Sequence, residues 1–254
     1  MAGRKDLQSK AFFIDKYEDF LKELELGDII FRPFFGGLLQ HAGIYCGSRK
    51  YIHPVVKKYL KPELNIVCPE CGQDLVLMDC GHNVHFVAEL SLCKTDEVEK
   101  SVKGLVAAKG AEGSSFRTKY NLCILKNFME DKGAYKYNFV DEDVKPLPVE
   151  QILERAMRAV TNPKYRQDYN LLSFNCECFA SFCRNGVATS KQVREIAEAI
   201  LDTAVSHLDA AGYRTAAYWI RIIALDTKKG RKRPAAEAGS EDDPDDDPKK
   251  AKKS

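Results

Sequence analysis

Hydrophobic positions repeat at helical spacing in three stretches of the chain. The spacing predicts an N-terminal helix over about 13–24, with Gly27 as its C-cap, a helix over about 150–160, and a long helix over about 193–208. Each pattern is typical of a helix that buries one face. The apolar positions are Phe13, Tyr17, Phe20, Leu21 and Leu24, then Ile152, Leu153, Ala156, Met157 and Val160, then Val193, Ile196, Ala197, Ile200, Leu201, Ala204, Val205 and Leu208.

Between these stretches the pattern changes to short runs rich in β-branched and aromatic residues, which predict strands. The runs are residues 28–31, 41–46, 50–53, 120–125 and 135–140. Residues 47–49 read as a hairpin loop between the second and third runs. Residues 55–115 are the least regular part and read as an insertion.

A cysteine stands at the start of a further predicted helix, which runs from Asn175 to Arg184. Asn175 is a favoured N-cap residue, and Cys176 follows it directly. The unpaired backbone N–H groups and the positive end of the helix dipole favour thiolate at this position, which suits a nucleophile. The alternative is a small buried core residue, and Cys178 and Cys183 read that way.

Two histidines lie near the predicted hairpin. If the loop is 47–49, Gly43 pairs with His53, so His41 and His53 share one face of the sheet as diagonal neighbours. A two-residue loop would move one of them to the other face. The first register supplies a base and a residue that orients it, which is how a cysteine nucleophile is activated. The alternative is two unrelated structural histidines.

These residues stand in motifs that resemble the lecithin:retinol acyltransferase family, most closely its branch of small phospholipase A and acyltransferase proteins, the HRAS-like suppressors. The motifs fall in the family's order and cover roughly residues 20–54 and 116–195. They are 27–34 (Gly-Asp-Ile-Ile-Phe-Arg-Pro-Phe), 41–45 (His-Ala-Gly-Ile-Tyr), 51–53 (Tyr-Ile-His), 145–148 and 152–156, 175–179 (Asn-Cys-Glu-Cys-Phe), 184–188 (Arg-Asn-Gly-Val-Ala) and 190–193.

The resemblance implies an α+β, papain-like fold in permuted order, with an antiparallel sheet and with histidine before cysteine. It implies that His41 takes the proton of Cys176 and that His53 orients His41. The thiolate would form an acyl-thioester from a glycerophospholipid substrate and pass the acyl group to water or an amine, as a phospholipase A or acyltransferase. No cofactor is expected for this catalysis.

Two positions depart from the family's pattern. Cys178 stands where histidine is usual, and Ala42 stands where an aromatic residue is common. Two other functions therefore stay open: an idle member of the same fold that acts as a binding or regulatory protein, and a cysteine hydrolase of amide bonds.

A cluster of cysteines and histidines lies within the predicted insertion. Cys68 and Cys71 form a Cys-x-x-Cys turn, followed by Cys80 and His82. Thiolates and imidazole at such spacing suit a tetrahedral structural Zn²⁺, and a segment poor in apolar residues gains folding free energy from a metal. The sequence predicts these four ligands within a zinc knuckle over 68–85, with His85 as the alternative to His82 and Cys93 as a further candidate. Free thiols or a redox-active Cys-x-x-Cys pair are the other interpretations.

Composition and charge place these features in one domain with a tail. The chain has 254 residues, 44% of them hydrophobic, which suffices for one buried core over 1–227. Residues 228–254 carry nine of the 39 Lys and Arg and seven of the 37 Asp and Glu, which leaves 30 of each sign before them. The neutral body gives no reason to expect direct nucleic-acid binding.

The tail, 228–254, is low in complexity and predicted to be disordered. Its basic clusters, 228–233 and 249–253, indicate either a nuclear-import signal read by an import receptor or a solvated tail. No secretory signal and no run of 18 apolar residues occurs, so we expect a cytoplasmic protein with nuclear access and without a transmembrane segment. Residues 218–223 suit either peripheral membrane contact or core packing.

Overall fold

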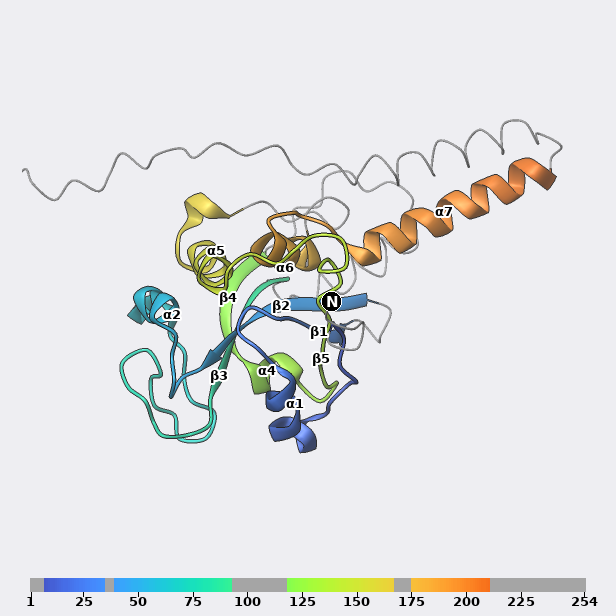
Figure 1. Cartoon of the computed structure of the whole chain (residues 1–254). Helices are drawn as coiled ribbons and strands as arrows, with labels where there is room; N and C mark the ends of the chain where they lie inside the picture. The colour runs from blue at the N-terminus through green and yellow to red at the C-terminus, as the bar shows by residue number, and fades with distance from the viewer. Residues whose placement is uncertain (1–6, 35–38, 93–117, 167–174, 211–254) are drawn as a thin grey trace, which may run out of the picture. The chain divides into compact units, whose positions relative to one another are not determined.

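An antiparallel sheet of five strands organises the part of the chain that the computed structural model describes, residues 7–34, 39–92, 118–166 and 175–210. The strands lie in the order β4-β3-β2-β1-β5 (Figure 1). They are β1 (Ile29–Phe34), β2 (Leu39–Ser48), β3 (His85–Leu92), β4 (Thr118–Ile124) and β5 (Tyr135–Lys136). Every pairing among these strands is antiparallel. The predicted α+β class is confirmed.

Helices cover both faces of the sheet. The described helices are η2 (Ile14–Lys16), α1 (Tyr17–Glu23), α2 (Pro54–Tyr59), η4 (Pro62–Leu64), α4 (Leu125–Met129), α5 (Val149–Thr161), η5 (Pro163–Tyr165), α6 (Cys176–Asn185) and α7 (Lys191–Ala210). Figure 1 shows α5 and α6 on one side of the sheet and α1 and α4 on the other. Alternation along β2 fits this arrangement, because Ala42 and Ile44 pack in the core with α5 and α6 while Tyr45 packs with α1 and α4.

The predicted helices are present where the hydrophobic spacing put them. All five apolar positions chosen for α5 are buried. The N-terminal helix ends at Glu23 with Leu24 as its C-cap, so Gly27 is not the cap. Gly27 instead has a positive φ of 85° and donates to the carbonyl of Tyr45 at 2.9 Å. A Cβ there would lie 3.0 Å from Cδ1 of Ile152, so glycine also lets α5 approach β1.

The predicted hairpin over 41–53 is wrong. Gly43 pairs with Ile30 on β1 and with Glu89 on β3. The chain leaves the sheet after Ser48, and His53 is the N-cap of α2, with its Nδ1 accepting from the N–H of Val55 at 3.3 Å. Pro54 explains the difference, since proline has no N–H for a strand pairing and its fixed φ suits the first helical position.

The predicted irregular insertion contains a central strand. Residues 85–92 form β3, which pairs with β2 over 85–89 on one side and with β4 over 86–92 on the other. Only residues 55–84 of the described insertion lie outside the sheet; they hold α2, η4 and a short bridge between Val67 and Asp74. The strand was missed because its pattern is interrupted by a buried carboxylate, Glu89.

The chain divides into two compact units, residues 1–203 and 204–254. The second unit is described only over 204–210, the end of α7. Among the described helices, none is long and apolar enough to cross a membrane. The predicted disordered tail, the segment 218–223 and the further candidate ligand Cys93 lie outside the described residues.

Candidate active site

The N-terminus of α6 brings Cys176 against the sheet. The Oδ1 atom of Asn175 accepts from the N–H of Cys178 at 3.0 Å, which confirms Asn175 as the N-cap. Cys176 is the first residue of α6 and is 6% exposed. Its Sγ lies 3.8 Å from the carbonyl oxygen of Gln40 on β2. The helix therefore holds the thiol beside the strand that carries His41.

A second set of hydrogen bonds fixes this helix end. The Nδ2 of Asn175 donates to the Oγ of Ser190 at 3.1 Å, and that hydroxyl donates to the Oε2 of Glu177 at 2.5 Å. The N–H of Val193 donates to the same oxygen at 3.2 Å, so Ser190 caps the start of α7. All three polar side chains are buried, which restricts movement of the residues around Cys176.

His41 lies between a thiol and a carboxylate. Its imidazole is 6% exposed and is hydrogen-bonded to Cys176. Its Nε2 is 2.7 Å from the Oε2 of Glu89, which leaves Nδ1 as the ring nitrogen for the thiol. Burial alone would lower the pKa of His41, but the hydrogen bonds and charges of Cys176 and Glu89 outweigh burial and raise the pKa to about 9. The ring of Phe128 packs against the imidazole with centroids 5.4 Å apart.

Glu89 is the candidate site residue that sequence reasoning missed. It is 8% exposed and lies on β3, opposite Asn121 of β4. Burial would raise its pKa, but hydrogen bonds from His41 and Asn121 and the charge of Arg32 give a net lowering. The Cys123 thiol also hydrogen-bonds to it. The available signal was one carboxylate in an otherwise apolar run, since charged residues are rarely buried unless they are paired.

The structure therefore brings together two of the three residues expected at the centre, Cys176 and His41. His53 stands at the start of α2, where it caps the helix, and not across a hairpin from His41. The side chain bonded to Nε2 of His41 is the carboxylate of Glu89. A cysteine, a histidine and a carboxylate in sequence form the arrangement of a nucleophile, a base and a residue that orients the base.

The matching family model fits this geometry. The model described as lecithin retinol acyltransferase matches residues 22–189, which include β1 to α6 and so the thiol, the imidazole and the carboxylate. The chain belongs to the lecithin retinol acyltransferase family. The resemblance found in the sequence motifs is thereby confirmed.

A curated relative is also similar. The chain is 42% identical over 71 residues to phospholipase A and acyltransferase 3 of Mus musculus, which covers 27% of this chain and 42% of that protein. The chain thus matches less than half the length of that relative.

Three other cysteines of the described domain, Cys46, Cys178 and Cys183, are core residues. Burial raises the pKa of Cys178, Cys183 and Cys46, to about 12 for Cys46, so these thiols stay protonated at neutral pH. Ala42 and Cys178, the two departures from the family's pattern, both pack in the core shared by the sheet, α5 and α6. Both departures therefore lie in packed positions beside the site.

The cysteine and histidine cluster is assembled as the spacing predicts. Ligand atoms of Cys68, Cys71, Cys80 and His82 all lie within 4.8 Å of one another. The alternative ligand, His85, is engaged elsewhere, because its Nδ1 lies 2.6 Å from the hydroxyl of Tyr45 and its Nε2 lies 2.8 Å from Oδ1 of Asn83. The four residues could hold one metal ion.

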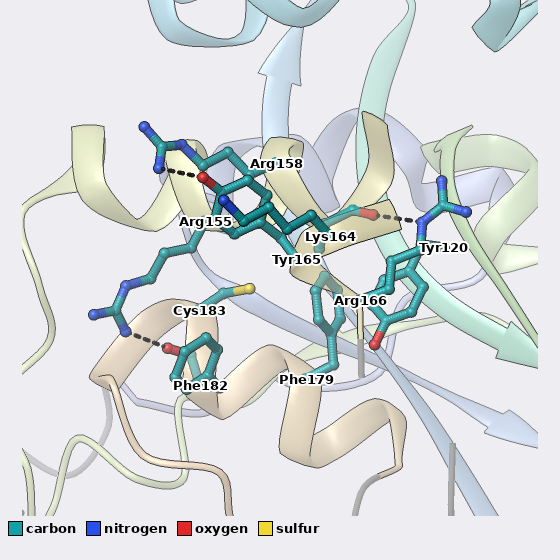
Figure 2. A pocket seen from close by; sticks show the side chains of 10 residues that line it. Tyr120, Arg155, Arg158, Lys164, Tyr165, Arg166, Phe179, Phe182 and Cys183 are labelled. Atoms are coloured by element: carbon teal, nitrogen blue, oxygen red, sulfur yellow. Dashed lines mark hydrogen bonds between the residues drawn. The ribbon is translucent and has the colours of Figure 1, made fainter. Parts of the chain in front are cut away.

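A cavity of about 330 Å³ lies elsewhere on the domain, between α5, η5, α6 and β4 (Figure 2). Its arginines stack on aromatic rings: Arg155 on Phe182 with 4.8 Å to the ring centroid, and Arg166 on Tyr120 with 5.8 Å. Arg155 and Arg166 also donate to backbone carbonyls, as Figure 2 shows. Cys183 contributes the sulfur in its lining, and this thiol stays protonated, so we place no chemistry in this cavity.

Proposed function

We propose that this chain is a thiol-dependent phospholipase A or acyltransferase that forms an acyl-thioester on Cys176 from a glycerophospholipid. One observation carries the proposal: the hydrogen bond between Cys176, at the start of a helix, and His41, whose other nitrogen is bonded to a buried carboxylate. The family membership and the similarity to mouse phospholipase A and acyltransferase 3 favour acyl transfer from phospholipid over other thiol chemistry.

The first half of the reaction acylates the enzyme. The Cys176 thiol gives its proton to Nδ1 of His41, and the thiolate attacks the ester carbonyl carbon, forming a C–S bond and an oxyanion. The N–H of Cys176, at the first position of α6, has no carbonyl within the helix to bond, so it is the proposed oxyanion donor. When the oxyanion collapses, the C–O bond of the ester breaks, and His41 returns its proton to the leaving lysophospholipid oxygen.

The second half releases the acyl group. His41 takes a proton from water or from an amine as that nucleophile attacks the thioester carbonyl. Collapse of the second oxyanion breaks the C–S bond and leaves a fatty acid or an amide, and the sulfur recovers its proton from His41. We also propose that the protein contacts a membrane surface, because its proposed substrate is a membrane component.

Glu89 takes the positioning role in this proposal. Its carboxylate is 2.7 Å from Nε2 of His41, so it fixes the ring orientation and stabilises the imidazolium that forms when Cys176 ionises. The family resemblance gave this role to His53. The position of His53 as the N-cap of α2 supports Glu89 instead.

We also infer that the fold is papain-like in permuted order. The strand that carries His41, β2, precedes the helix that carries Cys176, α6, along the chain. Helix α6 packs on one face of the antiparallel sheet to which β2 belongs. This order is the one that the family resemblance implied.

The experiment is incubation of the full chain with phospholipid vesicles that carry a labelled acyl chain, followed by mass spectrometry of the Cys176 peptide. We expect a thioester adduct at Cys176 that is lost in Cys176→Ala and strongly reduced in His41→Ala. Cys183→Ala is the matched control, since it removes a buried thiol of the same helix and should retain the adduct.

Two other outcomes would overturn the proposal in different ways. If a thiol probe labels Cys176 selectively and depends on His41, but only amide substrates acylate it, the chain is an amidohydrolase on the same scaffold. If labelling of Cys176 does not depend on His41 and no adduct forms from any acyl donor, the domain acts as a binding or regulatory module.

A further inference from the structure

The cluster of Cys68, Cys71, Cys80 and His82 has the dimensions of a tetrahedral metal site. With Zn–S bonds of about 2.3 Å and Zn–N bonds of about 2.0 Å, a tetrahedral sulfur and nitrogen lie about 3.5 Å apart. The Sγ of Cys68 lies 3.5 Å from Nδ1 of His82. No pair of the four ligand atoms is more than 4.8 Å apart, so one small ion can bind all four with only slight movement.

The backbone around the cluster holds the sulfurs in place. Cys68 donates its N–H to the carbonyl of Gln73, and its carbonyl accepts from Gly72, both at 2.9 Å. Gly72 and Gly81 have φ of 75° and 79°, a region that favours glycine, and each stands just after a cysteine of the cluster. The Cys68 sulfur also accepts from the N–H groups of the following turn, as thiolates in metal turns do.

The surroundings of the histidine also fit a ligand. His82 turns Nδ1 toward the sulfur of Cys68, and its Nε2 lies 3.7 Å from a carboxylate oxygen of Glu70. Metal-bound histidines usually give their second nitrogen to such an oxygen, which fixes the ring and raises its basicity. Glu70 is held in turn by Lys126 of α4 at 2.6 Å.

The choice of ligands indicates which metal. Three thiolates with one imidazole favour Zn²⁺ over Ca²⁺, Mg²⁺ or Mn²⁺, which prefer oxygen. Four protein ligands also fill the tetrahedron and leave no position for water or substrate, which is typical of a structural site and not of a catalytic one.

The geometry points to a structural zinc site of three cysteines and one histidine in residues 68–82, separate from the catalytic thiol. This segment is joined to the sheet through Arg49, which follows β2: its Nε donates to the carbonyl of Leu75 at 2.6 Å, and its N–H donates to the carbonyl of Val84 at 2.8 Å. Leu75 and Val84 are buried in the core. Strand β3, which carries Glu89, begins directly after Val84.

The zinc site therefore fastens the segment that leads into β3. Loss of the metal is expected to loosen residues 66–84 and the start of β3 before it affects α6, because α6 is held by contacts of its own with Ser190 and with β2. This expectation does not depend on the proposed acyl transfer, since it concerns metal content and local order.

The test is the metal content of the purified full chain, expressed with zinc in the medium and measured by inductively coupled plasma mass spectrometry. We expect about one zinc per chain. After exchange for Co²⁺, the visible spectrum should show thiolate-to-cobalt charge transfer and intense tetrahedral d–d bands. A folded chain that is purified from this medium without bound zinc, or a zinc-binding chain whose cobalt form is octahedral, would overturn the assignment.

Two variants locate the ligands. His82→Asn should bring the zinc content to background or leave a labile ion, whereas His85→Asn, the matched control, should retain about one zinc per chain. The reverse result would overturn the ligand set. Because His85→Asn also loses contacts with Tyr45 and Asn83, Cys71→Ser provides a second test at an exposed position, where loss of zinc cannot be ascribed to a disrupted core.

Hydrogen exchange separates a structural zinc from an adventitious one. Chelation should speed amide exchange over 66–84 in the wild-type chain and leave α6 protected. A chain that keeps the same protection after metal removal, or that shows a Cys68–Cys71 disulfide in place of bound metal, contradicts the inference.

Discussion

The carboxylate of Glu89 offers the sharpest test of the proposed centre. Glu89→Gln keeps the length of the side chain and one oxygen acceptor for His41, but removes the negative charge that faces the imidazole. The neighbours Asn121 and Cys123 can still contact the new amide, so the substitution changes charge more than packing.

The magnitude follows from the pKa of His41. Its partners raise that pKa from 6.5 to about 9. One pKa unit corresponds to about 1.4 kcal/mol. The partners of His41 therefore stabilise its imidazolium form by a net free energy of about 3 kcal/mol, which remains after they have offset the unfavourable effect of burial. Cys176 and Glu89 share this effect, and the contribution of Cys176 is the larger. Removal of the Glu89 charge should therefore cost about 1.4 kcal/mol, which lowers the pKa of His41 by about one unit.

The assay is the pH profile of Cys176 alkylation by iodoacetamide, followed by mass spectrometry of the Cys176 peptide so that the exposed Cys71 does not interfere. The rate at which the Cys176 thiolate reacts with iodoacetamide should change when the neighbouring His41 imidazolium loses its proton. The parent profile should have its upper inflection near pH 9. The profile of Glu89→Gln should have the same inflection about one unit lower.

Two further variants make the result decisive. Glu150→Gln removes an exposed carboxylate of α5 and should leave the profile unchanged. His53→Asn tests the role implied by the family resemblance and keeps an acceptor for the N–H of Val55, because asparagine is a good N-cap. An inflection that stays near pH 9 in folded Glu89→Gln but moves in His53→Asn would refute the role given to Glu89.

Three other predictions concern stability. Asn175→Ala should lower the free energy of unfolding by about 1–2 kcal/mol in urea melts, because it removes the cap of Cys178 N–H and the bond to Ser190; a loss no greater than that of Asn162→Ala, which caps the short η5, would contradict this. The contribution of His41 to the melting temperature should be complete below pH 6.5 and lost as pH rises through about 9, because folding raises the pKa of His41. A melting temperature that does not change between these pH values would contradict a charged His41. Cys178→Ser should destabilise the domain by about 1–3 kcal/mol, since it buries a hydroxyl in the core, yet leave the alkylation profile of Cys176 unchanged; a shifted profile would mean that this departure from the family's pattern acts on the site.

The helices of the domain could be predicted because local signals agree with tertiary packing. In α5, the spacing of Ile152, Leu153 and Ala156 marks the buried face whatever the helix packs against. In α6, the cap and the thiol are consecutive residues, so one local rule placed the nucleophile at a helix N-terminus. The cysteine and histidine cluster is likewise local, since its four ligands fall within a short segment closed by glycine turns.

Strand pairing is not a local property. Residues 50–53 have the composition of a strand, but Pro54 favours the start of a helix. Strand β2 pairs instead with β1 and with β3, which lies in the predicted insertion. Strands β2 and β3 are far apart in the sequence. The hydrophobic pattern of a strand indicates which of its faces is buried, but it does not indicate which strand pairs with it.

The sequence by itself determined the family, and its motifs and caps indicated the candidate nucleophile at the start of α6 and His41 as its candidate partner, because motifs and caps depend on neighbouring residues. The residue that we propose as the third member of the centre, Glu89, was decided by the tertiary structure alone. Glu89 and His41 lie on different strands, and only the pairing of β2 with β3 brings the carboxylate within 2.7 Å of the imidazole. A buried charge is tolerated only beside a partner, so the pairing of the strands and the position of the carboxylate depend on each other.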